Sequence, residues 1–215
     1  MPGDLPSRFY PIVDSAVCAA RGLEPRAVAE ACLRAGVRLI QLRVKARSSA
    51  AFLALADEIV ALAHTVGARV IVNDRPDIAR MSGADGVHVG QEDLPAAAAR
   101  RVLGRGLVGL STHSEAQIDE ALAGEADYVA VGPVYDTTTK DTGYGERGLG
   151  LVRRAAGRGK PIVAIGGIDL ARAPEVIAAG ASAVAVITDL LSGDPEARAR
   201  AYLQAITQAS RDDPR

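Results

Sequence analysis

Aromatic side chains are scarce in this chain, which has no tryptophan, five tyrosines and two phenylalanines among 215 residues. Proteins that bind single-stranded nucleic acid stack its bases on such rings, so we expect no stacking surface of that kind. The formal net charge is only -1, and a chain without a basic excess has little to hold a phosphate backbone. The composition therefore predicts that nucleic acid is not a partner.

Long apolar runs and cysteine pairs are missing as well. No apolar run approaches the roughly 20 residues that a membrane helix requires, so we expect no membrane partner. The first residues lack the charged start and apolar middle of a signal peptide. Cys18 and Cys32 are the only cysteines, and without CxxC spacing they favour two buried free thiols in a reducing compartment. We therefore predict a cytoplasmic protein, and its oligomeric state, a homo-oligomer included, stays open.

The chain does contain a regular alternation of short apolar segments and longer alanine-rich segments. The apolar segments are typical of buried parallel strands, and we place strands at 9–14, 38–44, 69–73, 86–90, 107–112, 128–132, 161–166 and 183–188. Cap and breaker residues predict helices at 25–36, 49–66, 75–84, 95–103, 114–123, 148–158, 170–179 and 195–208. Eight such units predict an α/β fold, a single (β/α)₈ TIM barrel over 1–215 with short disordered tails at 1–7 and 209–215. A doubly wound open sheet is the alternative.

Carboxylates follow two of these strands, which a crossover helix should make parallel neighbours. Asp74 comes directly after one strand, and Asp93 comes shortly after the next. Neighbouring strands lie about 4.8 Å apart, so both carboxylates would meet on one rim of the sheet. Carboxylates and waters are the usual ligands of Mg²⁺, and we predict a magnesium site at Asp74 and Asp93. The alternative is that Asp74 caps a helix and Asp93 starts a turn.

The second strand carries polar side chains at alternate positions. Gln41, Arg43 and Lys45 share one face, and in a barrel the face opposite Leu42 and Val44 is the interior. Unpaired charge is costly in an interior. We therefore predict that the two cations bind an anion, with a solvated edge strand as the alternative.

The loop at 133–147 holds two signals for phosphate. Thr137, Thr138, Thr139 and Lys140 place hydroxyls, backbone amides and an ammonium in succession, which suits a phosphate. The GxGxxG pattern at 143–148 is a weak dinucleotide signal, because ten residues separate it from the preceding strand. We expect its glycines to serve a lid that closes over substrates.

The ends of the last two strands form the common phosphate site of barrels. Gly166 and Gly167 would let backbone amides approach an anion, and Ile187 and Thr188 end the last strand. A glycine turn needed only for packing is the alternative.

Ser111 and two histidines complete the set of candidates. Ser111 lacks the partners of a Ser-His-Asp triad in this pattern, so we predict that it donates a hydrogen bond. His88 alternates with valines and is either a site residue or a satisfied core histidine. His113 follows the same strand as Ser111.

Taken together, these positions resemble the thiamine-phosphate synthase family along the whole chain. The family's motifs are Q-x-R-x-K, N-D, G-V-H-V-G-Q-x-D, a serine, T-x-T-K, G-G-I and an Ile-Ser/Thr pair. They fall on Gln41, Arg43, Lys45, Asn73, Asp74, His88, Gln91, Asp93, Ser111, Thr137, Thr139, Lys140, Gly167, Ile187 and Thr188. Asp136 departs from the family's usual proline, and the segment 143–148 resembles the sister family of thiazole tautomerases.

The resemblance implies an Mg²⁺-dependent transferase that joins 4-amino-2-methyl-5-(diphosphooxymethyl)pyrimidine to a thiazole phosphate and releases diphosphate. It implies catalytic roles for Lys140, Arg43, Lys45 and Ser111. The pyrimidine diphosphate would contact Gln41, Arg43, Lys45, Asn73, His88, Ser111 and Lys140. The thiazole phosphate would contact Thr137, Thr138, Thr139, Gly167, Ile187 and Thr188.

Two other functions stay open. A thiazole tautomerase would use one substrate, need no Mg²⁺ and rely on an acid-base group such as His113. A non-catalytic regulator would keep the phosphate sites and form no product. Mg²⁺ and the two phosphorylated small molecules are thus the expected cofactor and partners.

Overall fold

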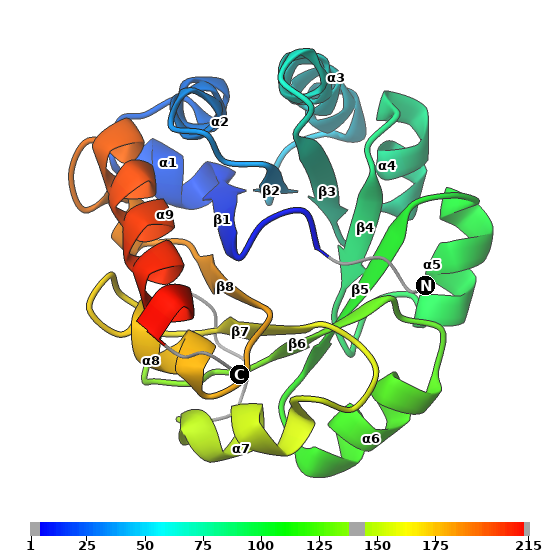
Figure 1. The fold of residues 1–215 in the computed structure, drawn as a ribbon. Coiled ribbons are helices and arrows are strands. Elements are labelled where there is room, and N and C mark those ends of the chain that lie inside the picture. Colours follow the sequence, from blue (N-terminus) through cyan, green and yellow to red (C-terminus); the bar gives the residue numbers. More distant parts are fainter. Residues whose placement is uncertain (1–4, 138–144, 213–215) are drawn as a thin grey trace.

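The strands of this protein close into a parallel barrel, with the helices around it (Figure 1). The computed structural model describes residues 5–137 and 145–212. Neighbouring strands pair in sequence order, and β1 pairs with β8 to close the ring. The predicted TIM barrel is confirmed, and the open-sheet alternative is wrong because an open sheet would leave two unpaired edges. The strands are β1 (Phe9–Asp14), β2 (Leu39–Arg43), β3 (Arg69–Asn73), β4 (Gly86–Val89), β5 (Leu107–Thr112), β6 (Tyr128–Val131), β7 (Ile162–Ile165) and β8 (Ala183–Val186).

The helices follow the strands in the expected alternation, with two additions. They are α1 (Ser15–Ala20), α2 (Pro25–Arg34), α3 (Ser49–Thr65), α4 (Pro76–Ser82), α5 (Ala96–Leu103), α6 (Glu115–Ala123), α7 (Gly148–Ala155), α8 (Ala173–Ala178), the 3₁₀ helix η1 (Asp189–Leu191) and α9 (Pro195–Asp212). Sequence reasoning missed α1 and η1, since both are short; α1 follows β1 directly, and η1 begins soon after β8. Within the described ranges, no helix is long and apolar enough to cross a membrane.

Several predicted boundaries need correction. Strands β7 and β8 end at Ile165 and Val186, so Gly166 and Thr188 lie in the loops beyond them. Helix α9 continues to Asp212, and residues 209–212 are therefore helical where we expected a disordered tail. At the other end, Leu5 packs against the barrel interior, which also contradicts a disordered segment there.

Local capping explains where some of these helices begin. The buried Asp14 accepts hydrogen bonds from the amides of Ala16 and Val17 and so caps α1. Ser114 caps α6 by accepting from the amide of Gln117 at 3.3 Å. The side chain of Gln117 accepts from the amide of His113, one residue before the cap.

Two apolar cores hold the barrel. The larger one lies between the strands and the helices, and the smaller one fills the barrel interior with Tyr10, Ile12, Leu39, Ile71, Tyr128, Ala130, Val163, Ala183 and Ala185. Where β1, β6 and β8 each contribute two residues, these stand at alternate positions, as the side-chain period of two requires. Tyr10 and Tyr128 place their aromatic rings and their polar hydroxyl groups inside the barrel.

Candidate active site

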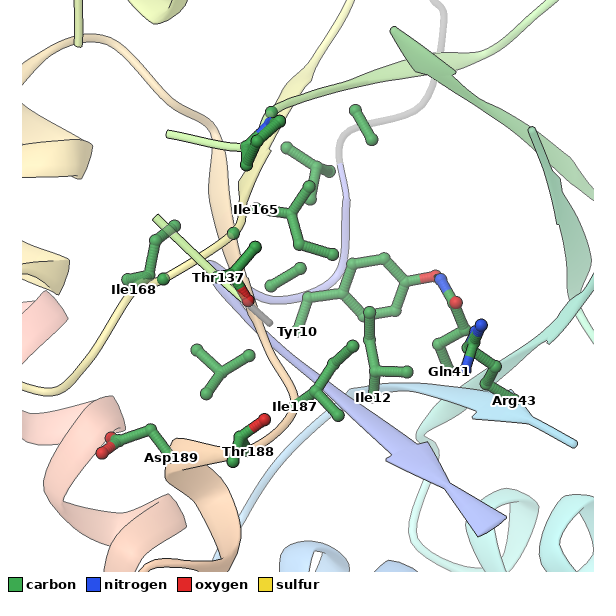
Figure 2. A pocket seen from close by; sticks show the side chains of 18 of the residues that line it. Tyr10, Ile12, Gln41, Arg43, Thr137, Ile165, Ile168, Ile187, Thr188 and Asp189 are labelled. Atoms are coloured by element: carbon green, nitrogen blue, oxygen red, sulfur yellow. The ribbon is translucent and has the colours of Figure 1, made fainter. Parts of the chain in front are cut away.

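A cavity of about 330 Å³ lies at the carboxyl ends of the strands, the end where barrel enzymes build their sites. Polar residues line it at two opposite ends, and apolar residues line it between them. Figure 2 shows Gln41 and Arg43 on one side of Tyr10 and Ile187, and Thr188 and Asp189 on the other. The residues predicted for the site that line it are Gln41, Arg43, Asn73, His88, Ser111, Thr137, Gly167, Ile187 and Thr188.

The polar face of β2 lies where the alternation predicted. Gln41 is buried and donates from Nε2 to the Tyr10 hydroxyl at 3.0 Å. Arg43 forms an ion pair with Asp14 of β1, whose side chain is only 1% exposed. Lys45 lies past the strand end, outside the cavity lining, with Nζ 2.5 Å from Oδ2 of Asp74. The edge-strand alternative is wrong, since β2 pairs on both sides. Each cation also has a carboxylate partner within the fold, and binding of a further anion stays a prediction.

The two carboxylates predicted to hold a metal are neighbours. β3 and β4 pair in parallel with Asn73 opposite His88, and the Asp74 amide donates to the His88 carbonyl at 2.8 Å. Asp74 has the left-handed φ of 64°, a conformation that costs free energy for a residue other than glycine. Burial raises the pKa of Asp93, and the adjacent Asp74 carboxylate raises it further, against the lowering effect of the Gly90 amide and Lys45.

Two crowded carboxylates, of which Asp93 has a raised pKa, suit a divalent cation, because a cation between them would remove their repulsion. Oδ2 of Asp93 also accepts from the Gly90 amide at 2.8 Å, which fixes that side chain on the rim. Within residues 5–137 and 145–212, no group of three or more His, Cys, Asp or Glu side chains could hold a metal. A magnesium site here would thus rest on two carboxylates, with waters or substrate oxygens as its other ligands.

A chain of hydrogen bonds crosses the floor of the cavity. The hydroxyls of Tyr10 and Tyr128 lie 3.0 Å apart, and the Tyr128 hydroxyl lies 3.0 Å from Nδ1 of His88. Nε2 of His88 lies 2.8 Å from Oγ of Ser111. His88 thus agrees with both interpretations of the sequence: it is a buried, hydrogen-bonded histidine, and it also lines the cavity.

Gly109 makes room for this chain. A Cβ atom at Gly109 would lie 2.5 Å from Nδ1 of His88 and would overlap the ring of Tyr128. Gln91 donates from Nε2 to the Ser111 carbonyl at 2.6 Å, and thereby ties the loop after β4 to β5. The Ser111 hydroxyl hydrogen-bonds to Nε2 of His88, whose Nδ1 lies against the Tyr128 hydroxyl.

The ends of β7 and β8 form the other side of the cavity. Gly166 and Gly167 have φ of 100° and 62°, which favours glycine. A Cβ atom at Gly167 would lie 2.5 Å from the Asp136 carbonyl oxygen, and one at Gly166 would lie 2.6 Å from Cα of Pro133. Both positions therefore require glycine for packing, and they also leave the backbone open to the cavity.

Part of the predicted phosphate loop falls outside the described residues. Thr137 lines the cavity, whereas Thr138, Thr139 and Lys140 lie outside the ranges that the structure describes. Their roles, and the lid predicted at 133–147, stay predictions. On the described side of this loop, His113 Nδ1 donates to the Gly132 carbonyl at 2.6 Å and His113 lines the cavity.

Sequence reasoning missed several residues of the site. Tyr10 lines it and hydrogen-bonds to Tyr128, and Asp14 pairs with Arg43. Asp189 lines the opposite side and accepts from Arg198 and from the Tyr202 hydroxyl. Alternation in β1 gave a usable signal, since Tyr10 shares a face with Ile12, but no sequence signal joins Tyr10 to Tyr128 across 118 positions.

The comparisons with known proteins agree with this geometry. The model of the family described as thiamine monophosphate synthase matches residues 9–190. The chain belongs to the thiamine monophosphate synthase family. A thiamine-phosphate synthase of Chloroflexus aurantiacus is 38% identical over 208 residues, which cover 95% of this chain and 94% of that protein. One from Mycobacterium sp. (strain JLS) is 47% identical over 191 residues, 83% of this chain and 84% of that one.

Solved structures support the same assignment. Thiamine phosphate pyrophosphorylase from Pyrococcus furiosus superposes with a TM-score of 0.85 at 25% identity and covers 94% of this chain and 96% of that chain. The predicted family is thus confirmed, and so is the prediction that the chain is an enzyme, a transferase of thiamine biosynthesis.

Proposed function

We propose that the chain joins 4-amino-2-methyl-5-(diphosphooxymethyl)pyrimidine to a thiazole phosphate and forms thiamine phosphate and diphosphate. The observation that carries the proposal is the division of one cavity. Arg43 lines one end of this cavity, with Lys45, Asp74 and Asp93 on the adjoining rim, and an open glycine backbone lines the other end beyond β7 and β8. Two phosphorylated substrates could therefore bind with their reacting atoms between these two ends.

The leaving group would bind on the side of β2 to β4. Arg43 and Lys45 present charge that Asp14 and Asp74 already hold in place, so little side-chain entropy is lost when a diphosphate binds. Asp74 and Asp93 would hold Mg²⁺, which when bound offsets the negative charge that collects on a departing diphosphate. We assign Lys140 to the same anion, from the family motif.

The reaction is balanced without a further reagent. The bond between the pyrimidine methylene carbon and the diphosphate oxygen breaks, and its electron pair leaves with the diphosphate. The lone pair of the thiazole nitrogen then forms the new C–N bond. Preorganised cations lower the barrier of the first step, and the shared cavity supplies proximity for the second.

The interior wall would protect the cationic pyrimidine from water. Ile12, Ala130, Val163 and Ile165 line the cavity between its two polar ends. A wall of this kind offers no nucleophile and no hydrogen-bond partner for a water molecule. We assign Gln41, Asn73, His88 and Ser111 to orienting the pyrimidine and its diphosphate, as the family motifs imply.

The thiazole phosphate would bind opposite. Gly167, Ile187 and Thr188 line that part of the cavity with Thr137, and backbone amides beside glycines suit a phosphate. We also assign Thr138 and Thr139 to this phosphate, from the family motif. We propose the cytoplasm as the location, since Cys18 and Cys32 are free and buried and burial raises the pKa of Cys18 to about 11.

A thiazole tautomerase is the second candidate, because His113 lines the cavity with Nδ1 fixed on a carbonyl. The experiment mixes purified protein with each substrate alone and with both, with and without Mg²⁺, and measures diphosphate and thiamine phosphate. Synthesis predicts both products only when both substrates and Mg²⁺ are present. Isomerised thiazole phosphate without diphosphate would support the tautomerase, and binding without any product would support the regulator.

A further inference from the structure

We propose that Tyr10 and Tyr128 are positioning residues that link Gln41 to Ser111 through one directional hydrogen-bond relay. The relay comprises Gln41, Tyr10, Tyr128, His88 and Ser111. Its direction decides which end of the cavity floor offers a donor and which offers an acceptor. The orientation of the Gln41 amide would thus be coupled to the Ser111 hydroxyl across four hydrogen bonds.

The relay is continuous and closed to other protein partners at its centre. Its four heavy-atom separations are 3.0, 3.0, 3.0 and 2.8 Å, all within hydrogen-bond range. Among the described residues, the hydroxyls of Tyr10 and Tyr128 have no partners besides their relay neighbours. Burial raises the pKa of both tyrosines, so each carries one hydroxyl proton at neutral pH.

Counting protons gives the relay only two directions. Each tyrosine has a single proton, and a neutral imidazole has one donor and one acceptor nitrogen. When Gln41 Nε2 donates to Tyr10, Tyr10 donates to Tyr128 and Tyr128 donates to Nδ1 of His88. Nε2 of His88 then carries the ring proton and donates to Ser111, whose own proton can point into the cavity. If the Gln41 amide is turned over, every one of these donors becomes an acceptor.

The two ends of the relay both reach the cavity. Gln41 Oε1 has no hydrogen-bond partner among the described residues. Every fully buried side-chain oxygen of these residues does have a partner. Oε1 is therefore not fully buried and is exposed to the cavity that Gln41 lines. Ser111 lines the cavity at the other end. In the first direction Gln41 offers an acceptor and Ser111 a donor; in the second the two roles are exchanged.

The first direction fits the proposed substrate, and this part of the inference rests on the proposed function. The exocyclic amine of an aminopyrimidine is a donor, and it requires an acceptor such as Oε1 of Gln41. A diphosphate only accepts, and it requires a donor such as the Ser111 hydroxyl. A relay set in this direction would hold the Gln41 acceptor and the Ser111 donor in the required orientations before the substrate binds. Less side-chain entropy would then be lost on binding.

The test needs no substrate. Glu in place of Gln41 removes the amide donor, and an ionised carboxylate only accepts. At a pH at which the new carboxyl is ionised, Gln41→Glu should therefore reverse the relay and move the His88 ring proton from Nε2 to Nδ1. Nitrogen-15 NMR of the imidazole distinguishes the two tautomers, and His88→Gln identifies the signal among the three histidines. The relay predicts Nε2–H in the parent protein and Nδ1–H in Gln41→Glu.

The matched variants separate a relay from local contacts. Tyr10→Phe leaves Gln41 and His88 unchanged but removes the hydroxyl that joins Gln41 to Tyr128, so Gln41→Glu should no longer move the proton in that background. Tyr128→Phe interrupts the same path and replaces Tyr10→Phe if that variant does not fold. Thr112→Val removes a buried hydroxyl bonded to the Ala130 carbonyl outside the relay and should leave the tautomer response intact.

Kinetics give a second readout. Tyr10→Phe should lower kcat/KM for the pyrimidine diphosphate about tenfold, as expected for one mispaired hydrogen bond, and leave KM for the thiazole phosphate unchanged. A His88 tautomer that ignores Gln41→Glu, or one with both nitrogens protonated in the parent protein, would overturn the relay. Failure to release diphosphate would instead overturn the proposed function and leave the tautomer result standing.

Discussion

Arg43 and Lys45 should differ sharply in what their removal does to stability, although both lie on the same strand face. The Asp14 side chain that pairs with Arg43 is 1% exposed, whereas the Lys45 side chain is 50% exposed. Breaking a buried ion pair typically costs about 3–5 kcal/mol. Asp14 keeps two backbone donors, the amides of Ala16 and Val17, so we expect about 2–3 kcal/mol for Arg43→Ala. An exposed pair contributes at most about 1 kcal/mol, and Lys45→Ala should cost less than that.

The measurement is urea unfolding combined with steady-state kinetics. Both variants should raise KM for the pyrimidine diphosphate at least about tenfold, equivalent to ~1.4 kcal/mol, with little change for the thiazole phosphate. Asp14→Asn is the matched control, because it keeps an acceptor for α1 while removing the charge. Arg43→Ala should cost less than half as much stability in that background.

Two results would refute this reasoning. Equal free energies of unfolding for Arg43→Ala and Lys45→Ala would show that the Asp14 pair does not stabilise the fold. Equal losses of affinity for both substrates would show that the two cations act through general charge and not on the diphosphate.

Three further predictions follow from single positions. Gly167→Ala should destabilise the protein by about 1–3 kcal/mol because of its φ and the nearby Asp136 oxygen, and should raise KM for the thiazole phosphate; unchanged melting would contradict this. The pKa of Asp93 in the folded protein is raised above the ordinary 3.8, so the folded state binds this proton more tightly than the unfolded state does. Protonation of Asp93 therefore stabilises the folded metal-free protein, and that stabilisation should be lost as the pH rises through the raised pKa. Asp93→Asn should remove this loss, seen as a flatter dependence of melting temperature on pH, and an unchanged slope would contradict it. Lys140→Ala should lower kcat about a hundredfold or more with KM for the thiazole phosphate unchanged, measured as initial rates.

The positions of the site could be predicted from the sequence because a parallel barrel places all carboxyl strand ends on one rim. Asp74 and Asp93 follow consecutive strands, so the fold class alone made them neighbours. Alternation likewise placed Gln41 in the interior. These inferences need only the period of two and the direction of the strands.

The partners of those residues could not be predicted in the same way. Arg43 contacts Asp14 because β1 and β2 pair with those two residues opposite each other. The sequence of neither strand predicts this register. The contact between Tyr10 and Tyr128 joins β1 to β6 across the barrel. Strand ends were also uncertain, and both Gly166 and Thr188 proved to lie in loops, where their backbone can face a ligand.

The central claim, that Asp74 and Asp93 bind Mg²⁺ for the release of diphosphate, has a direct test. Diphosphate release is followed with both substrates while Mg²⁺ is titrated, for the parent protein and for Asp93→Asn, with Glu92→Gln as a neighbouring control. We expect Mg²⁺-dependent release from the parent and the control, and a loss of at least about a hundredfold in Asp93→Asn, ~2.7 kcal/mol of transition-state stabilisation. Release by Asp93→Asn at the parent's rate and with the parent's dependence on Mg²⁺ would contradict the claim.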